Sequence, residues 1–155
     1  MKLISLLEKL EYTCLQGSTD QEVKNVVYDS RKVEEGSLFI CIRGAVVDGH
    51  KFVPDVVAKG AKVLIVEEAV EAPEDVTVIL VKDTRYAMAF ISAAYFGYPA
   101  EKLKTIGITG TKGKTTTTYM VKSILENAGY KVGLIGTIEA IIGDKVIPAK
   151  NTTPE

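Results

Sequence analysis

A glycine-rich segment in the second half of the sequence constrains the fold more than any other feature. It spans residues 107–116 and reads Gly-Ile-Thr-Gly-Thr-Lys-Gly-Lys-Thr-Thr. A strand-like pattern over residues 105–109 leads into it, and a helical pattern over residues 115–128 follows it. Glycines at such a junction let successive backbone N–H groups turn inward, where they and the positive end of the helix dipole bind phosphate. The segment therefore predicts a phosphate-binding loop.

Two side chains of this loop have the chemistry that a bound polyphosphate requires. Lys114 would reach the β- and γ-phosphates, and the Thr115 hydroxyl would bind Mg²⁺. The strict pattern places glycine at position 108, whereas this chain has Ile108 there and Gly107 one place earlier. The alternative is a glycine-rich helix start without a ligand. A lysine in the first helical turn opposes the helix dipole unless an anion compensates it, so we favour phosphate binding.

The first part of the chain alternates strand and helix patterns. We expect strands at residues 37–42, 62–66 and 76–81, and helices at residues 52–59 and 85–96, which end at Gly60 and Gly97. This alternation predicts an α/β fold with helices layered on a sheet. Residues 1–11 carry leucines at helical spacing, interrupted by charges, and predict a short amphipathic surface helix.

A short polar break at Tyr98-Pro99-Ala100-Glu101-Lys102 predicts a domain boundary between residues 98 and 99. Beyond it, a strand at 105–109, a helix at 115–128 capped by Gly129 and a strand at 131–135 predict a right-handed βαβ unit. Residues 138–142 and 145–149 flank Gly143-Asp144 and predict a hairpin. This second part is far shorter than the ~100–150 residues of a typical domain, so we expect the chain to stop inside it.

Composition excludes several other classes of protein. The net charge of -1 gives no argument for binding nucleic acid or a membrane surface. No apolar run approaches the ~18 residues of a membrane-spanning helix, and no secretory signal is present. The two cysteines, Cys14 and Cys41, are too few for a disulfide framework and fit a reducing, cytoplasmic compartment. Cys41 lies in an apolar run, where we expect it to pack as a small hydrophobe.

Three stretches of the sequence together resemble the Mur ligase family. Thr-Gly-Thr-Lys-Gly-Lys-Thr at residues 109–115 is similar to the ATP loop of that family, which departs from the strict pattern in the same way. Asp29-Ser30-Arg31, followed by Gly36-Ser37-Leu38-Phe39 and Asp48-Gly49-His50, resembles the family's N-terminal domain. Asn151-Thr152-Thr153-Pro154 resembles a segment of the members that add the third residue of the peptidoglycan stem peptide.

The resemblance implies the role of each part. Residues 1–98 would be the domain that binds the UDP-muramyl-peptide, and residues 99–155 would begin the central ATP-binding domain. The activity implied is ATP-dependent ligation of an amino acid, diaminopimelate or lysine, to UDP-N-acetylmuramoyl-L-Ala-D-Glu through an acyl phosphate. The residues implied to contact ATP are Gly110, Thr111, Lys112, Gly113, Lys114, Thr115 and Thr116, with Lys114 catalytic and Thr115 on Mg²⁺. Those implied to contact the UDP-substrate are Tyr28, Ser30, Asn151, Thr152 and Thr153.

Other interpretations stay open at this point. Asp29-Ser30-Arg31 alone is compatible with an ordinary turn, and Asn151-Thr152-Thr153-Pro154 with a polar tail. His50, the only histidine, is interpreted as structural, with no second metal ligand beside it in sequence. The rivals in function are the D-Ala-D-Ala-adding Mur ligase, folate polyglutamate ligases, a P-loop kinase and a non-catalytic nucleotide-binding module. The chain by itself is expected to be inactive, and its oligomeric state is not predicted.

Overall fold

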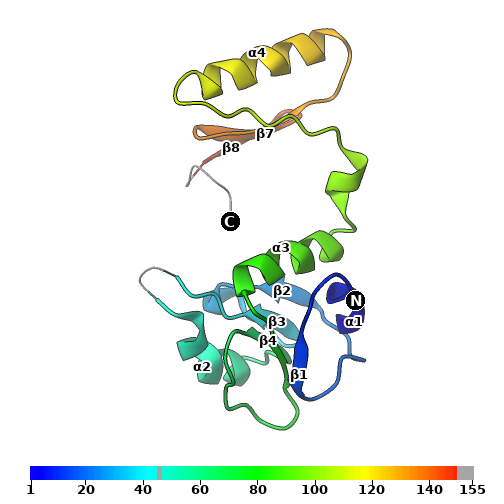
Figure 1. The fold of residues 1–155 in the computed structure, drawn as a ribbon, viewed down its shortest axis with the longest axis vertical. Helices are drawn as coiled ribbons and strands as arrows, with labels where there is room; N and C mark the ends of the chain where they lie inside the picture. Colours follow the sequence, from blue (N-terminus) through cyan, green and yellow to red (C-terminus); the bar gives the residue numbers. More distant parts are fainter. Residues whose placement is uncertain (45–46, 150–155) are drawn as a thin grey trace. The chain divides into compact units, whose positions relative to one another are not determined.

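The computed structural model describes residues 1–44 and 47–149, which form two compact units, Met1–Leu103 and Lys104–Glu155. Each unit is considered by itself. The first contains five strands, three helices and three 3₁₀ turns (Figure 1). They are α1 (Leu3–Leu6), β1 (Thr13–Gln16), β2 (Asn25–Val27), η1 (Ser30–Lys32), β3 (Ser37–Ile40), η2 (Gly49–Phe52), α2 (Val53–Ala58), β4 (Val63–Val66), β5 (Thr77–Leu80), α3 (Thr84–Tyr95) and η3 (Pro99–Lys102).

The five strands form one sheet in the order β1-β5-β4-β3-β2. Strands β2 to β5 are parallel, and β1 pairs antiparallel with β5 at the edge. Every residue of β3 and β4 is buried. A parallel sheet covered on both faces selects such uninterrupted apolar strands. The strands predicted at 37–42, 62–66 and 76–81 are thereby confirmed, each shorter at its ends.

Two apolar cores cover the two faces of this sheet. Because successive strand residues point to opposite faces, Leu38 and Ile40 enter one core and Phe39 and Cys41 enter the other. Helices α1 and α3 cover the first face, and α2 covers the second (Figure 1). The predicted α/β layering is therefore confirmed. The predicted N-terminal helix is a single turn whose leucines are buried.

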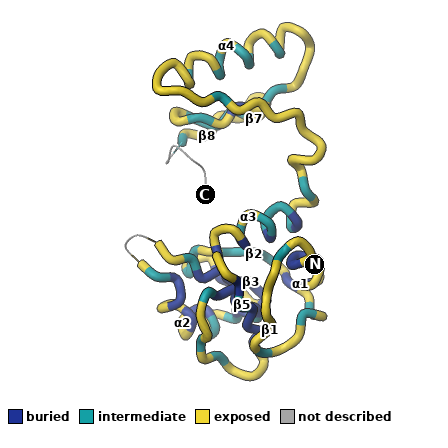
Figure 2. Tube along the Cα trace, viewed as in Figure 1, coloured by how far each residue is buried: buried dark blue, intermediate teal, exposed yellow. Residues whose placement is uncertain are grey.

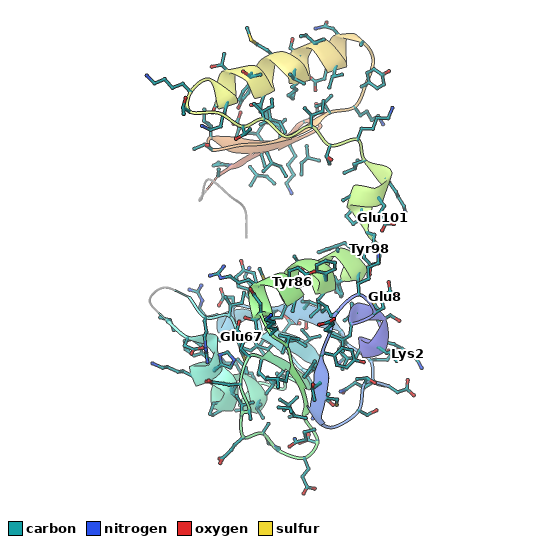
Figure 3. All side chains as sticks on the ribbon, viewed as in Figure 1. Lys2, Glu8, Glu67, Tyr86, Tyr98 and Glu101 are labelled. Carbon is teal, nitrogen blue, oxygen red and sulfur yellow. The ribbon has the colours of Figure 1, made fainter. Side chains whose placement is uncertain are left out.

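Local signals place the helix ends where the sequence predicts them. The Asp83 carboxylate caps α3 by accepting a hydrogen bond from the Tyr86 N–H at 2.9 Å. Gly97 has φ +70° just beyond the last turn of α3, a conformation that glycine adopts without the steric cost of a Cβ. At the same end of the helix, the Tyr98 hydroxyl donates to Glu8 Oε1 at 2.8 Å (Figure 3). This contact joins α3 to the chain that follows α1.

The second unit contains α4 (Lys114–Asn127), β6 (Gly133–Ile135), β7 (Glu139–Ile142) and β8 (Lys145–Pro148). Its strands form an antiparallel sheet in the order β6-β7-β8. The predicted hairpin is confirmed, with Gly143 at φ +58° in its turn. The predicted helix and its C-terminal glycine are also confirmed, since Gly129 has φ +86° after α4. The Tyr119 hydroxyl donates to the Glu139 carboxylate and connects α4 to β7.

One predicted strand of this unit is absent. Residues 105–109 belong to no strand in the part of the chain that the structure describes, so the βαβ prediction is wrong here. A strand requires a neighbour that supplies hydrogen-bond partners. β6, the second strand of the predicted unit, pairs only with β7 among the described residues. Ile106 is accordingly 62% exposed.

The second unit buries few of its apolar side chains. No residue of α4 is buried, and Leu134 is the only buried hydrophobic residue among the described residues 104–149 (Figure 2). Met120 and Ile124 on α4 are 62% and 67% exposed. The other apolar side chains of this unit are half-buried, as Val121 and Leu125 are, or exposed. Among the described residues of both units, no helix combines the length and apolar character needed to cross a membrane.

The two cysteines have different surroundings, and their reactivities should differ. Cys41 is fully buried, and burial, with a smaller contribution from the Asp48 carboxylate, raises the pKa of its thiol to about 12. Cys14 is exposed on the edge strand β1. At pH 8 we expect a thiol reagent to modify Cys14 quickly and Cys41 only after denaturation, because the thiolate is the reactive species. Peptide mass spectrometry of the native protein would contradict this if it found Cys41 labelled as fast as Cys14.

Candidate functional site

The carboxyl ends of the parallel strands bring together polar residues from four separate segments. In open α/β sheets, ligands bind at this edge. The Asp29 turn follows β2, Arg43 follows β3, Glu67 and Glu68 follow β4, and Thr84 follows β5. These residues define what we call the carboxyl edge. Of these four segments, only the Asp29 turn contains residues that the sequence predicts to contact the substrate.

The Asp29-Ser30-Arg31 turn is held by its own charged side chains. The Asp29 carboxylate accepts hydrogen bonds from the Arg31 backbone N–H at 3.0 Å and from the Arg31 guanidinium at 2.9 and 2.7 Å. The guanidinium is the main cause, and the N–H a second cause, of an Asp29 pKa well below its usual range. The turn leaves Tyr28 47% exposed and Ser30 half-buried, with the Ser30 carbonyl accepting from Lys59 Nζ at 3.1 Å. The two residues predicted to meet the UDP end of the substrate therefore lie at one strand end.

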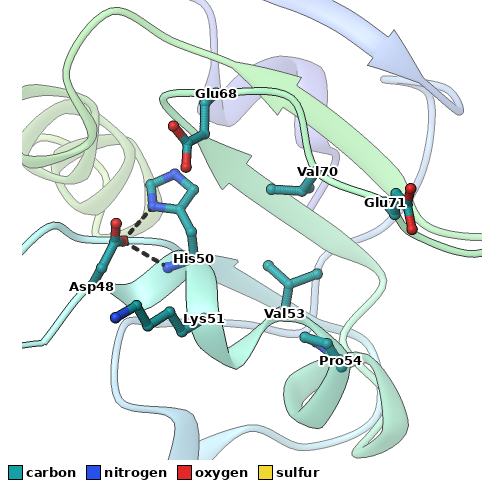
Figure 4. Close-up of a pocket in the computed structure, with 8 residues that line it drawn as sticks. All are labelled: Asp48, His50, Lys51, Val53, Pro54, Glu68, Val70 and Glu71. Atoms are coloured by element: carbon teal, nitrogen blue, oxygen red, sulfur yellow. Dashed lines mark hydrogen bonds and ion pairs between the residues drawn. The ribbon is translucent and has the colours of Figure 1, made fainter.

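His50 occupies a buried position between two segments of this edge. It is 8% exposed, and its Nδ1 lies 2.6 Å from Asp48 Oδ1 (Figure 4). The backbone N–H of Glu67 donates to its Nε2 at 3.0 Å. Since Nε2 accepts, the proton of the neutral ring is on Nδ1 and is donated to Asp48. The backbone N–H and ring of His50, with Arg43 contributing less, hold the pKa of the Asp48 carboxyl below its ordinary value.

Glu67 extends this arrangement to the start of α3. Its Oε1 accepts from both the backbone N–H and the hydroxyl of Thr84, at 2.8 and 2.7 Å. Thr84 is fully buried, and Glu67 lies near the N-terminal end of α3 (Figure 3). Because the first N–H groups of a helix lack partners within it, a carboxylate at this place stabilises the helix start. A series of hydrogen bonds thus runs from Asp48 through His50 and Glu67 to Thr84.

Arg43 ties the same segments together from the surface. Its guanidinium forms an ion pair with Glu68 and lies 3.4 Å from Asp48 and 3.9 Å from Glu67. The arginine also forms an isolated β-bridge with Asp48, which closes the base of the loop that joins them. The side chain is 46% exposed, so each pair contributes little alone. Together they fix the position of the loop relative to the end of β4.

Asp48, His50 and Glu68 each offer a ligand atom within 4.8 Å of the others, beside an open pocket of about 370 Å³ (Figure 4). This cluster does not have the features of a metal site. Both imidazole nitrogens of His50 are occupied by hydrogen bonds, and both carboxylates already form ion pairs with Arg43. The interpretation of His50 as structural fits this geometry. The structure places two carboxylates beside His50. Asp48 is its neighbour in sequence, whereas Glu68 comes close only through the fold.

The glycine loop lies in the second unit and has the predicted backbone character. Gly110 and Gly113 have φ +151° and +76°, and no heavy atom lies within 4 Å of where a Cβ on Gly113 would stand. Helix α4 begins at Lys114, whose Nζ donates to the Gly110 carbonyl at 2.6 Å. Thr111, Lys112 and Thr116 are exposed and Thr115 is half-buried. The loop therefore offers open space, a helix N-terminus and an ammonium group, which together fit a polyphosphate.

Three of the predicted substrate contacts have no described structure. Asn151, Thr152 and Thr153 lie outside the described residues. Tyr28 and Ser30 lie close together in the first unit. Residues 110–116 form one loop and helix start in the second unit. Arg43, Glu67 and Glu68 were missed, because ion pairs and caps between residues 17 to 25 positions apart leave no mark on local spacing.

Two family models match the chain. The model described as "Mur ligase family, catalytic domain" matches residues 22–96, and the "Mur ligase middle domain" model matches residues 108–155. A curated relative, the UDP-N-acetylmuramoyl-L-alanyl-D-glutamate--2,6-diaminopimelate ligase of Clostridium perfringens, is 54% identical over 155 residues. The alignment covers 100% of this chain and 32% of the relative, so the chain spans about a third of that protein's length.

Solved structures resemble the fold as well. The UDP-N-acetylmuramoylalanyl-D-glutamyl-2,6-diaminopimelate--D-alanyl-D-alanyl ligase from Acinetobacter baumannii is 33% identical with a TM-score of 0.63, over 88% of this chain and 29% of that one. The MurF ligase from Thermotoga maritima, solved in complex with ADP, is 27% identical with a TM-score of 0.50, over 68% of this chain and 24% of that one. Both similarities support the α/β arrangement described above.

Proposed function

The chain belongs to the Mur ligase family, and from that premise we propose that it supplies the substrate-binding and nucleotide-binding parts of an ATP-dependent ligase. The proposed reaction joins 2,6-diaminopimelate to UDP-N-acetylmuramoyl-L-alanyl-D-glutamate. The observation that carries this proposal is the 54% identity to a ligase of that name along the whole chain. Residues 1–98 would bind the UDP-substrate, and residues 99–155 would contribute the start of the ATP domain.

The glycine loop is the proposed site for ATP and Mg²⁺. Gly110 to Thr116 would surround the phosphates, with Lys114 on the transferred phosphoryl group and the Thr115 hydroxyl on Mg²⁺. The positive φ values of Gly110 and Gly113 and the position of Lys114 at the loop support this assignment, as does the ADP bound by the Thermotoga maritima relative. ATP supplies the phosphoryl group that activates the D-glutamate carboxylate for attack by the incoming amine. The contribution of this chain is alignment and neutralisation of negative charge.

The carboxyl edge of the first unit is the proposed site for the UDP end of the substrate. Ser30 and Tyr28 lie at the end of β2, where ligands of parallel sheets bind. Asn151, Thr152 and Thr153 would contact the sugar-peptide. Consumption of ATP and two unpaired thiols favour a cytoplasmic location.

The D-Ala-D-Ala-adding ligase is the second candidate, because a solved structure of that name matches 88% of this chain with a TM-score of 0.63. Two curated relatives that match along the whole chain, at 54% and 49% identity, are both named as diaminopimelate ligases, and this favours the first candidate. Folate polyglutamate ligases and P-loop kinases do not account for the match of residues 22–96 to the Mur ligase catalytic model.

Product analysis of the intact protein, as its complete gene encodes it, tests the proposed function. With ATP, Mg²⁺ and UDP-N-acetylmuramoyl-L-Ala-D-Glu, we expect a UDP-muramyl-tripeptide to form with meso-diaminopimelate. Parallel reactions would contain lysine instead, or a UDP-tripeptide with D-Ala-D-Ala. Mass spectrometry identifies each product. Formation only of the D-Ala-D-Ala adduct would replace the assignment by its rival, and absence of every adduct would refute the ligase proposal.

A further inference from the structure

We propose that His50 is a positioning residue for the UDP-substrate site, acting by fixing residues 47–49, which we call the loop, against the end of β4. This inference rests on the proposed function, because it concerns the affinity of the same site. The carboxyl edge contains residues that face the proposed ligand and residues that only hold others in place. His50 belongs to the second kind, since it is 8% exposed and both its ring nitrogens are hydrogen-bonded within the protein.

The two hydrogen bonds of His50 connect two segments that are far apart in sequence, the Asp48 turn and the end of β4. Asp48 lies two residues before the histidine, whereas Glu67 lies 17 residues after it, beyond α2 and β4. The first contact orients the imidazole, as the Asp48 carboxylate accepts the Nδ1 proton. The second gives a partner to the half-buried Glu67 backbone N–H at the end of β4. The imidazole therefore sets the distance between the loop and that strand end.

The base of the loop has little freedom to compensate for a lost contact. The Gly49 N–H donates to the Ile42 carbonyl at 2.9 Å. A Cβ on Gly49 would stand 2.7 Å from the Ile42 nitrogen, which leaves no room for a side chain. The Gly44 N–H donates to the Val47 carbonyl at 2.9 Å. These contacts hold residues 47–49 to the segment that leaves β3, while His50 and Arg43 tie them to the end of β4.

The loop position bears on the UDP-substrate through the neighbouring strand. Strands β2 and β3 are paired in parallel, with Val27 opposite Phe39. Neighbouring strands lie ~4.8 Å apart, so Tyr28, directly after β2, is near the residues that leave β3 toward the loop. The proposed uridine contacts and the loop held by His50 are therefore adjacent parts of one edge. Displacing the loop therefore changes the shape of that edge.

Replacing His50 by leucine in the intact protein tests the proposal. Leucine keeps apolar bulk but makes neither hydrogen bond. We expect the KM for the UDP-substrate to rise about tenfold or more, whereas the KM for ATP and kcat at saturating UDP-substrate stay within about twofold of wild type. This split follows because weaker ground-state binding raises KM without slowing the chemical step.

Two conservative variants separate the two contacts. The glutamine Oε1 introduced by H50Q can stand near the former Nε2 and accept from the Glu67 N–H, so this variant should recover most of the affinity if that contact positions the loop. The side-chain amide introduced by H50N instead replaces Nδ1 and keeps only the Asp48 contact. We expect the order of KM values to be wild type, then H50Q, then H50N and H50L. These variants also cover the case in which the leucine variant fails to fold.

A stability-matched control distinguishes positioning from general weakening of the fold. Val56 in α2 is fully buried in the core beneath the sheet and makes no polar contact at the edge. V56A should lower the melting temperature as H50L does and leave the KM for UDP-substrate unchanged. An equal rise of KM in V56A, or a folded H50L protein with wild-type KM, would overturn the proposal while wild-type ligation still supports the proposed function. A wild-type protein without ligase activity would overturn both.

Discussion

Replacement of Lys114 by alanine in the intact protein is expected to lower the rate of ligation by about 10²–10³-fold, the typical effect of removing one preorganised contact to developing charge. Binding of the UDP-substrate should remain as in wild type. Lys114 opens α4, and its ammonium group lies 2.6 Å from the Gly110 carbonyl, at the centre of the loop. No apolar contact is lost, because the side chain is exposed. The effect should therefore fall on phosphoryl transfer and not on folding.

Two measurements together check the Lys114 prediction. Steady-state ADP release, dependent on UDP-substrate and amino acid, reports the rate, and calorimetric titration with UDP-substrate reports the affinity for that substrate. Lys131→Ala is the matched control, because Lys131 is an exposed lysine in the same unit beyond the end of α4. It should change neither quantity. Ligation by the Lys114 variant within tenfold of wild type would contradict the role assigned to the loop.

Replacement of Phe39 by alanine is expected to lower the free energy of unfolding of the first unit by about 3–5 kcal/mol. Phe39 is 1% exposed in the middle of β3 and contributes the largest fully buried side chain of the unit. Its removal leaves a cavity against α2 that the paired strands on either side cannot collapse into. The loss is a large fraction of the total stability of a domain of this size, about 5–15 kcal/mol.

Hydrogen exchange measured by mass spectrometry suits this test, because it reports the opening of one unit in a larger protein. Peptides from β3 and β4 should exchange about 10²–10⁴-fold faster in F39A, at about 1.4 kcal/mol per factor of ten. Phe96→Ala is the control with the same change of residue, since Phe96 is 72% exposed just after α3. It should change the exchange of these strands by less than about tenfold. Equal protection in F39A and wild type would show that the β3 core is not limiting.

Several elements of the fold were predictable because their signals are local. The apolar runs of β3, β4 and β5 are long enough to mark buried strands, and Asp83 and Gly97 mark the two ends of α3. Strand β1 was not predicted. Its residues are mostly exposed and carry no apolar period, so its pairing with β5 decides its conformation. Strand β2 has only three half-buried residues and is likewise defined by its pairing with β3.

The candidate site divides in the same way. Tyr28, Ser30 and the loop around Lys114 could be predicted as candidates because each belongs to a short contiguous motif. The Arg43 ion pairs with Glu68 and the Glu67 cap on Thr84 were not, since each joins segments separated by a helix or strand. His50 was identified as structural, but the partner of its Nε2, the Glu67 N–H, emerges only when β4 is placed beside β3.

The sequence by itself determined the family, the glycine loop and the order of helices and buried strands, because caps, glycines and apolar periods act over a few residues. The tertiary structure decided which extended segments became strands. Residues 105–109 have a strand-like pattern yet remain unpaired, whereas the exposed β1 is a strand because β5 offers it an edge. The tertiary structure also decided which residues meet around His50 at the carboxyl edge. The physical reason is that strand pairing and ion-pair networks depend on a neighbour that local sequence does not specify.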